Sequence, residues 1–239
     1  MDWFAPIDAY CERLGPGVWA EPLNAATNLA FLLGAAVAWQ AWRRASRRDG
    51  VTLAFILLVA VIGLGSFLFH TLANGWSLLA DVIPIAVFIY GFFALALFRF
   101  VGLRPALAVT GTIGFAVAAQ VVERMAGPVL GSSASYLPAL LALGGIGGVL
   151  LARRHGAGRW LLGAAAVFVL SLTFRTLDAP LCDAHPLGTH FLWHVLNAAT
   201  LTLCLLAAIR YPAESEGLRP AGPAGPRTTG SASDPVRRP

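Results

Sequence analysis

The chain has 239 residues, of which 57% are hydrophobic and only 12% are charged, whereas a soluble domain carries about 25% charged residues. Too little polar surface is available to dissolve a globule of this size. The composition therefore excludes an ordinary soluble protein and predicts an integral membrane protein. All 17 basic residues are arginines, and they are scattered between apolar runs rather than gathered on one surface, which excludes a nucleic-acid binder.

A membrane-spanning helix needs roughly 20 apolar residues, and seven stretches of the chain qualify. In chain order they cover residues 25–42, 51–70, 79–98, 105–122, 134–152, 159–175 and 188–209. The predicted fold class is all-α: an integral membrane bundle of seven transmembrane helices over residues 25–210. An acidic segment, 1–24, precedes the bundle, and residues 211–239 are rich in Pro, Gly, Ser and Arg, which predicts a disordered tail.

The arginines predict the orientation, because cytoplasmic loops carry an excess of basic residues. Three of them, Arg13, Arg124 and Arg175, fall on one side of the predicted bundle, and all the others follow helices one, three and five or lie in the tail. The N-terminus is therefore expected outside the cell and the C-terminus in the cytoplasm. The acidic N-terminal segment then lies on the outer side.

Three of the five histidines fall near the outer face. His70 ends the second predicted helix, and His190 and His194 occupy the first turns of the seventh, where a spacing of four residues places both imidazoles on one face. Three histidines with a fourth position open to water are a ligand set of catalytic zinc, so these residues predict a zinc site. We interpret His155, in a cytoplasmic arginine loop, and His185, in an outer loop, as bystanders.

Two further polar residues fall at the same depth. Ser66 lies one turn before His70 on the same helix face, and Asp81 opens the third predicted helix. Beside a zinc ion, a carboxylate can accept a proton from water and a hydroxyl can steady a developing oxyanion. A histidine at a helix end is commonly an interfacial side chain, and two histidines four residues apart are weak evidence of metal. The convergence of five polar residues at one depth favours the metal site.

A second cluster, in the N-terminal segment, is acidic and contains Asp8, Glu12 and Glu21. Calcium prefers six to eight oxygen ligands, but the spacing is not that of an EF-hand. From the residues alone, solvated acids outside the membrane are the simpler interpretation. Asn24 and Asn28 share one face of the first predicted helix, where their amides need partners inside the bundle, either as packing contacts or as support for a site.

Three stretches, AEPLNAATNLAFL, SFLFHTLANGWSLLAD and GTHFLWHVLNA, together resemble the alkaline ceramidase family. This family belongs to a superfamily of seven-helix membrane hydrolases that includes the adiponectin-receptor-like proteins. Its pattern is a serine four residues before the first histidine, an aspartate eleven after it and a late HxxxH pair, and the five residues above have these spacings. The resemblance covers nearly all of the predicted membrane part. The arginine-rich, lysine-free composition points to a bacterial member in the inner membrane, with its site near the periplasmic face.

The resemblance implies a zinc amidase that cleaves ceramide, or a related N-acyl lipid, into a sphingoid base or amine and a fatty acid. Asp81 and Ser66 would be the catalytic side chains beside the zinc ligands. The lipid tails are expected in a cavity within the bundle, with Phe67, Phe69 and Trp193 as candidates to line it.

The resemblance also implies a calcium site in the N-terminal segment, where Asp8, Glu12 and Glu21 are the matching acids. The stretch between the last two, RLGPGVWA, is shorter than in the animal members of the family.

The predicted topology places Cys11 and Cys182 on the outer side, where disulfides persist, and a cysteine in each of these segments resembles a family feature. We therefore predict a bridge between them, against the alternative of two unpaired thiols. Cys204, deep in the seventh predicted helix, is expected to remain a free buried thiol.

Two other functions remain open at the level of sequence. A receptor or lipid-binding protein of the same superfamily would hold a structural zinc ion with little turnover, but would need neither Asp81 nor Ser66. A transporter would place polar residues at mid-membrane, whereas here they gather near one face.

Overall fold

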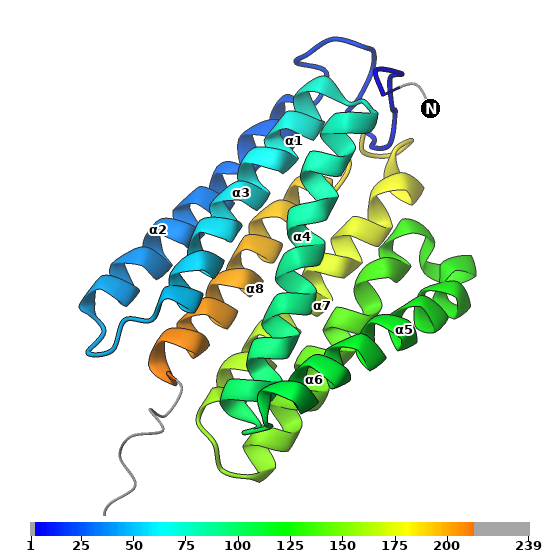
Figure 1. Ribbon diagram of the computed structural model, residues 1–239. Coiled ribbons are helices and arrows are strands. Elements are labelled where there is room, and N and C mark those ends of the chain that lie inside the picture. Colours follow the sequence, from blue (N-terminus) through cyan, green and yellow to red (C-terminus); the bar gives the residue numbers. More distant parts are fainter. Residues whose placement is uncertain (1–2, 213–239) are drawn as a thin grey trace, which may run out of the picture.

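The computed structural model describes residues 3–212, which are helical apart from connecting segments and one isolated β-bridge between Pro6 and Asn74 (Figure 1). The elements are α1 (Pro22–Thr27), α2 (Leu29–Arg44), α3 (Gly50–Leu72), α4 (Gly75–Leu95), the π-helical turn η1 (Ala96–Phe100), α5 (Pro105–Leu130), the 3₁₀ turn η2 (Gly131–Tyr136), α6 (Leu137–Ala152), α7 (Ala157–Leu181) and α8 (His190–Arg210). The all-α prediction is confirmed. The predicted disordered tail lies, from residue 213 on, outside the described residues.

Within residues 3–212, six helical stretches are long and apolar enough to cross a membrane. The fourth of them, Pro105–Ala152, is a run of 48 residues that contains α5, η2 and α6. Its two ends lie together, because the Arg153 guanidinium donates to the Val101 carbonyl at 3.5 Å. The run therefore doubles back at η2, where Gly131 has a φ of +54° that favours glycine.

Polar side chains cap the N-terminal ends of α3 and α4. Asp49 begins α3 by accepting the N–H of Thr52 at 2.8 Å. A capping box begins α4, in which Asn74 and Ser77 accept each other's backbone N–H. Only Ala73, with a φ of +42°, and Asn74 separate α3 from α4. This tight connection keeps the last turn of α3 and the first turns of α4 at the same end of the bundle.

The apolar core runs along the bundle between α2, α3, α4, α7 and α8. Its fully buried members include Phe31, Val59, Ile62, Leu161 and Leu205. The helix α8 packs against α2, α3 and α7 and is the most buried of the six stretches. Large apolar side chains cover the outside of α2, α3 and α5, as lipid-facing surfaces require. Polar side chains on the inner faces of α3 and α8 are thereby shielded from both water and lipid.

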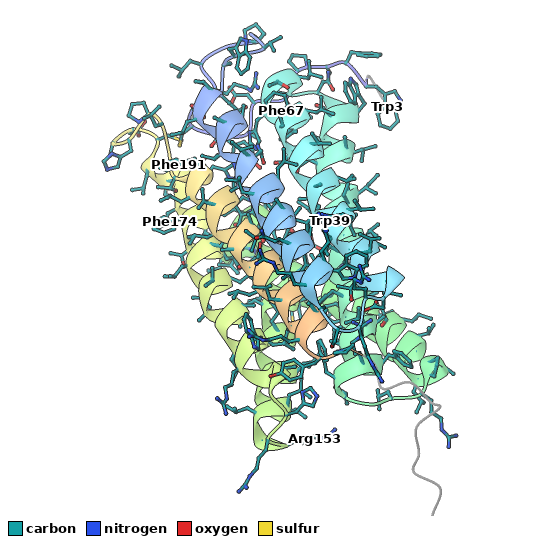
Figure 2. All side chains as sticks on the ribbon, turned by 90° about the vertical axis from the view of Figure 1, so that its left-hand side faces the viewer. Trp3, Trp39, Phe67, Arg153, Phe174 and Phe191 are labelled. Atoms are coloured by element: carbon teal, nitrogen blue, oxygen red, sulfur yellow. A yellow bond between two sulfur atoms is a disulfide. The ribbon has the colours of Figure 1, made fainter. Side chains whose placement is uncertain are left out.

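The two ends of the bundle differ in character. Trp3 and Phe67 lie at the end formed by the N-terminal segment, and Arg153 lies at the opposite end (Figure 2). The arginine-rich end also holds the ion pair between Asp49 and Arg99, 2.9 Å apart. The same guanidinium donates to a carbonyl of α8 at 3.1 Å. These contacts join α3, η1 and α8 at the end remote from the histidines.

Candidate metal centre

The three predicted zinc ligands meet at the N-terminal end of the bundle. His70, from the last turn of α3, and His190 and His194, from the first turns of α8, are each 1% exposed. One ring nitrogen of each lies within 4.8 Å of the other two. His70 Nε2, His190 Nδ1 and His194 Nε2 are buried and have no hydrogen-bond partner. Three unpartnered imidazole nitrogens that converge in a buried space fit a zinc ion.

The opposite nitrogens of two of these rings are held by other side chains. His70 Nδ1 is 2.5 Å from a carboxylate oxygen of Glu21, and His194 Nδ1 is 3.0 Å from the Thr27 hydroxyl. Such partners fix the orientation of a ligating imidazole and raise its basicity. Glu21, which is also bound by the Asn24 amide at 3.1 Å, thus orients a predicted zinc ligand. Asn24 therefore contacts the side chain that holds one of the three converging histidines.

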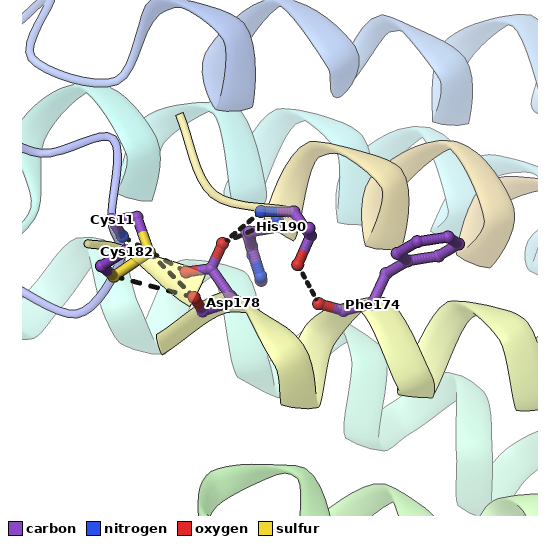
Figure 3. Close-up of a disulfide and its surroundings, with 6 residues drawn as sticks. Cys11, Phe174, Asp178, Cys182 and His190 are labelled. Carbon is purple, nitrogen blue, oxygen red and sulfur yellow. Dashed lines mark hydrogen bonds between the residues drawn. A yellow bond between two sulfur atoms is a disulfide. The ribbon is translucent and has the colours of Figure 1, made fainter. Parts of the chain in front are cut away.

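Asp178, near the end of α7, positions the start of α8 (Figure 3). One of its carboxylate oxygens accepts the N–H groups of Thr189 at 2.7 Å and His190 at 2.9 Å. Its other oxygen accepts the N–H of Cys11 at 3.2 Å. A carboxylate at a helix N-terminus satisfies free N–H groups and complements the helix dipole. Sequence reasoning missed this residue, whose only signal is a carboxylate in the last turns of an apolar helix.

The predicted disulfide between Cys11 and Cys182 is present, and Cys204 is free and buried. The bridge ties the N-terminal segment to the end of α7, beside the start of α8 (Figure 3). It also holds Tyr10 over the converging histidines, where its ring stacks on His190 with the centroids 3.7 Å apart. Burial raises the pKa of the Tyr10 phenol, which therefore stays protonated. Sequence reasoning did not single out Tyr10.

Ser66 lies one turn before His70 on α3, and Asp81 is near enough to His70 to interact with it electrostatically. Any side chain at Gly65 would collide with the carbonyl of Ala80, so glycine permits the close approach of α3 and α4 at this point. This approach brings the Ser66 side chain into interaction with the Asp81 carboxyl group, and Asp81 interacts electrostatically with His70. Both Ser66 and Asp81 are buried, and Asp81 Oδ1 has no hydrogen-bond partner. A proton acceptor thus lies next to the converging histidines.

The acids predicted for calcium do not come together. Within the described part of the chain, no three carboxylates lie close enough to share an ion. Asp8 is exposed, whereas Glu12 is buried and caps α1 by accepting the N–H groups of Leu23 at 2.6 Å and Asn24 at 2.8 Å. Both oxygens of Glu12 are therefore engaged by the backbone.

The remaining predicted calcium ligand, Glu21, is paired with Arg13. The Arg13 Nε is 2.5 Å from Glu21, both side chains are buried, and Arg13 Nη2 donates to the carbonyl of His70 at 3.1 Å. Burial raises the pKa of Glu21, but the hydrogen bonds from His70, Arg13 and Asn24 outweigh it and lower the pKa overall. A calcium ion on this carboxylate would be repelled by the guanidinium in a medium of low dielectric constant. The observed donor set does not fit calcium.

An apolar cavity begins one helical turn from the site. Ile62 lies one turn before Ser66 on α3, and Ile85 lies one turn after Asp81 on α4. Further walls come from α6, α7 and α8, among them Leu143, Phe168, Asn197 and Leu201. Three aromatic residues expected to line such a cavity are not among its walls: Phe67, Phe69 and Trp193. Trp193 instead packs against Phe168, behind the cavity wall.

No protein-family model matches the chain, and no curated protein sequence matches it. The resemblance to the alkaline ceramidases therefore depends on the three motif stretches alone.

Proposed function

We propose that the protein is a membrane-embedded, zinc-dependent hydrolase that cleaves the amide bond of ceramide or a related N-acyl lipid. The observation that carries this proposal is the set of three buried, unpartnered histidine nitrogens beside the unpartnered carboxylate oxygen of Asp81. Structural zinc sites are closed by four protein ligands, whereas catalytic sites keep one position open. Three histidines and a neighbouring free carboxylate favour a hydrolase over a receptor with a structural zinc ion.

The residues around the histidines match the needs of amide hydrolysis. A zinc ion held there would supply a Lewis acid that polarises the carbonyl and makes water acidic. Asp81 would accept the proton of the attacking water and return it to the leaving amine. Ser66, on the adjacent turn, would donate its hydroxyl to the oxygen that becomes negative. Glu21 and Thr27 hold two of the imidazoles in a fixed orientation throughout.

The cavity supports a substrate with a long apolar chain. Its walls are almost entirely aliphatic and aromatic, and it starts one turn from Ser66 and Asp81. An acyl chain in the cavity would place its carbonyl beside the histidines and its head group at the N-terminal end of the bundle.

We further propose seven membrane crossings with the N-terminus outside. The run Pro105–Ala152 doubles back on itself, so its α5 and α6 would cross separately. Most arginines follow the helix ends remote from the histidines, and the positive-inside rule assigns that end to the cytoplasm. The metal centre would then lie near the periplasmic face of a bacterial inner membrane.

Metal analysis and hydrolysis of N-acyl lipids by the purified protein test the proposal. We expect one zinc ion per chain, lost together with activity in His194→Ala but retained in the control His185→Ala, because His185 is exposed. Asp81→Asn should keep zinc and lose about 10²- to 10⁴-fold in turnover, the usual contribution of an acid–base group. Near-normal turnover of Asp81→Asn would contradict the assigned role. Bound zinc without hydrolysis of any lipid would favour a receptor.

A further inference from the structure

Arg175 lies next to the metal centre and has no acidic partner. Within the described residues, the ion pairs at or below 4.0 Å do not include it. Its guanidinium carbon instead lies 5.9 Å from the ring centroid of Tyr10, 5.1 Å from that of Tyr136 and 5.2 Å from that of Trp193. The Tyr10 ring in turn stacks on His190. A single aromatic ring thus separates this cation from a predicted zinc ligand.

The hydrogen bonds of Arg175 leave part of its donor set unused. Nη1 donates to the Tyr10 hydroxyl at 3.1 Å, and Nη2 donates to the Ser132 hydroxyl at 3.4 Å. Its Nε is buried and has no partner. The contact with Ser132 lies at the surface, so one edge of the guanidinium is open to the N-terminal end of the bundle.

An anion would pair well with the Arg175 guanidinium. Arg175 is half-buried, and its buried Nε has no partner. Aromatic faces stabilise a cation, but a partly desolvated charge with an unpartnered N–H is costly unless an opposite charge pairs with it. Asp81 is near enough to interact electrostatically but lies beyond ion-pair distance. The planar fork of an arginine matches carboxylate and phosphate oxygens in a bidentate manner.

We propose that Arg175 binds an acidic oxygen of the substrate head group, so that the preferred substrate is an anionic N-acyl lipid. This inference depends on the proposed hydrolase function. With the acyl chain in the cavity and the amide at the histidines, the head group falls at the open edge of Arg175. Either a carboxylate or a phosphate, close to the scissile amide, would supply the negatively charged oxygen that Arg175 binds.

Binding of matched lipids tests the inference without relying on turnover. The probes share one acyl chain and carry an N-linked head group with a carboxylate, the methyl ester of that carboxylate, a phosphate or a neutral sphingoid base. Wild-type protein should bind an acidic probe at least about tenfold more tightly than the methyl ester, the usual value of a charge-assisted hydrogen bond. A comparison of the carboxylate and phosphate probes identifies which of these two groups Arg175 prefers.

Variants test whether Arg175 causes the preference for acidic lipids. Arg175→Gln should lose the tenfold preference and raise KM for acidic lipids, with neutral lipids changed less than about twofold, and Arg175→Lys should retain part of it. The control Arg124→Gln removes an exposed arginine of α5 and should behave as wild type. Equal binding of acid and methyl ester by wild-type protein would overturn the inference even if Arg175→Gln does not fold, and so would an equal loss on all lipids.

The failures of the two proposals are distinguishable. A protein that prefers acidic lipids but hydrolyses none retains the anion site and loses the hydrolase function. A protein that hydrolyses neutral N-acyl lipids as well as acidic ones retains the hydrolase function and loses the anion site.

Discussion

Replacement of Glu21 by glutamine separates two roles that the structure combines in one carboxylate. One oxygen of Glu21 pairs with Arg13 Nε, and the other contacts His70 Nδ1, with both distances 2.5 Å. Glutamine has nearly the same shape, but it lacks the charge. Arg13 would then be a buried cation without a counter-ion, and His70 would lose the anionic acceptor that makes its other nitrogen a stronger ligand.

The expected loss of folding stability and the expected loss of zinc affinity differ in size. Removing one partner of a buried ion pair costs about 3–5 kcal/mol of stability, and here Glu21 is 2% exposed and Arg13 is 7% exposed. Removing the side chain that supports a metal ligand costs about 10- to 100-fold in metal affinity. Glu21→Gln should therefore be both less stable and weaker in zinc binding. Arg13→Gln should lose stability while it binds zinc within a few-fold of wild type, because Glu21 still holds His70.

Chelator competition measures the zinc affinity, and denaturant titration in mixed micelles measures the free energy of unfolding. The double variant with Arg13→Gln and Glu21→Gln has no unpaired buried charge. It should recover stability relative to Glu21→Gln but retain the weakened zinc affinity. Wild-type zinc affinity in Glu21→Gln would refute the supporting role of this carboxylate. A double variant no more stable than Glu21→Gln would refute the role of the buried ion pair.

Three further predictions concern the frame around the site. Burial raises the pKa of Asp49, but its bonds to a backbone N–H and to the arginine of η1 lower the pKa overall; its stabilisation is therefore complete above the unfolded value of about 3.9 and is lost as the pH falls below it. Thermal unfolding should show this loss in wild type and not in Asp49→Asn, and parallel pH profiles would contradict it. Gly65→Leu should push α4 away at Ala80 and reduce turnover more than zinc content, so a fully active variant would disprove the need for close approach. Replacing Cys11 and Cys182 together by serine should cost about 2–5 kcal/mol, and an unchanged midpoint of thermal unfolding would contradict this.

Several features follow from the amino-acid sequence because they depend on local pattern. Apolar runs of membrane-spanning length predict helices whatever their partners are, since lipid leaves the backbone no other way to satisfy its hydrogen bonds. The spacing of His190 and His194 places both rings on one helix face without reference to the rest of the fold. Ser66 and His70 share a face of α3 for the same reason. Local pattern is therefore sufficient to predict which side chains share a helix face, whereas the meeting of α3 with α8 brings the three histidines together.

The partners of these residues could not be read from the sequence, because each lies far away along the chain. Glu21, expected to hold calcium, instead contacts His70, 49 positions further on, and pairs with Arg13. Asp178 acts on the N-terminus of α8 only because the chain folds back after α7. Helical periodicity determines which face a side chain occupies. Only tertiary packing decides which charge meets it there, and this packing places the Arg13 guanidinium beside Glu21.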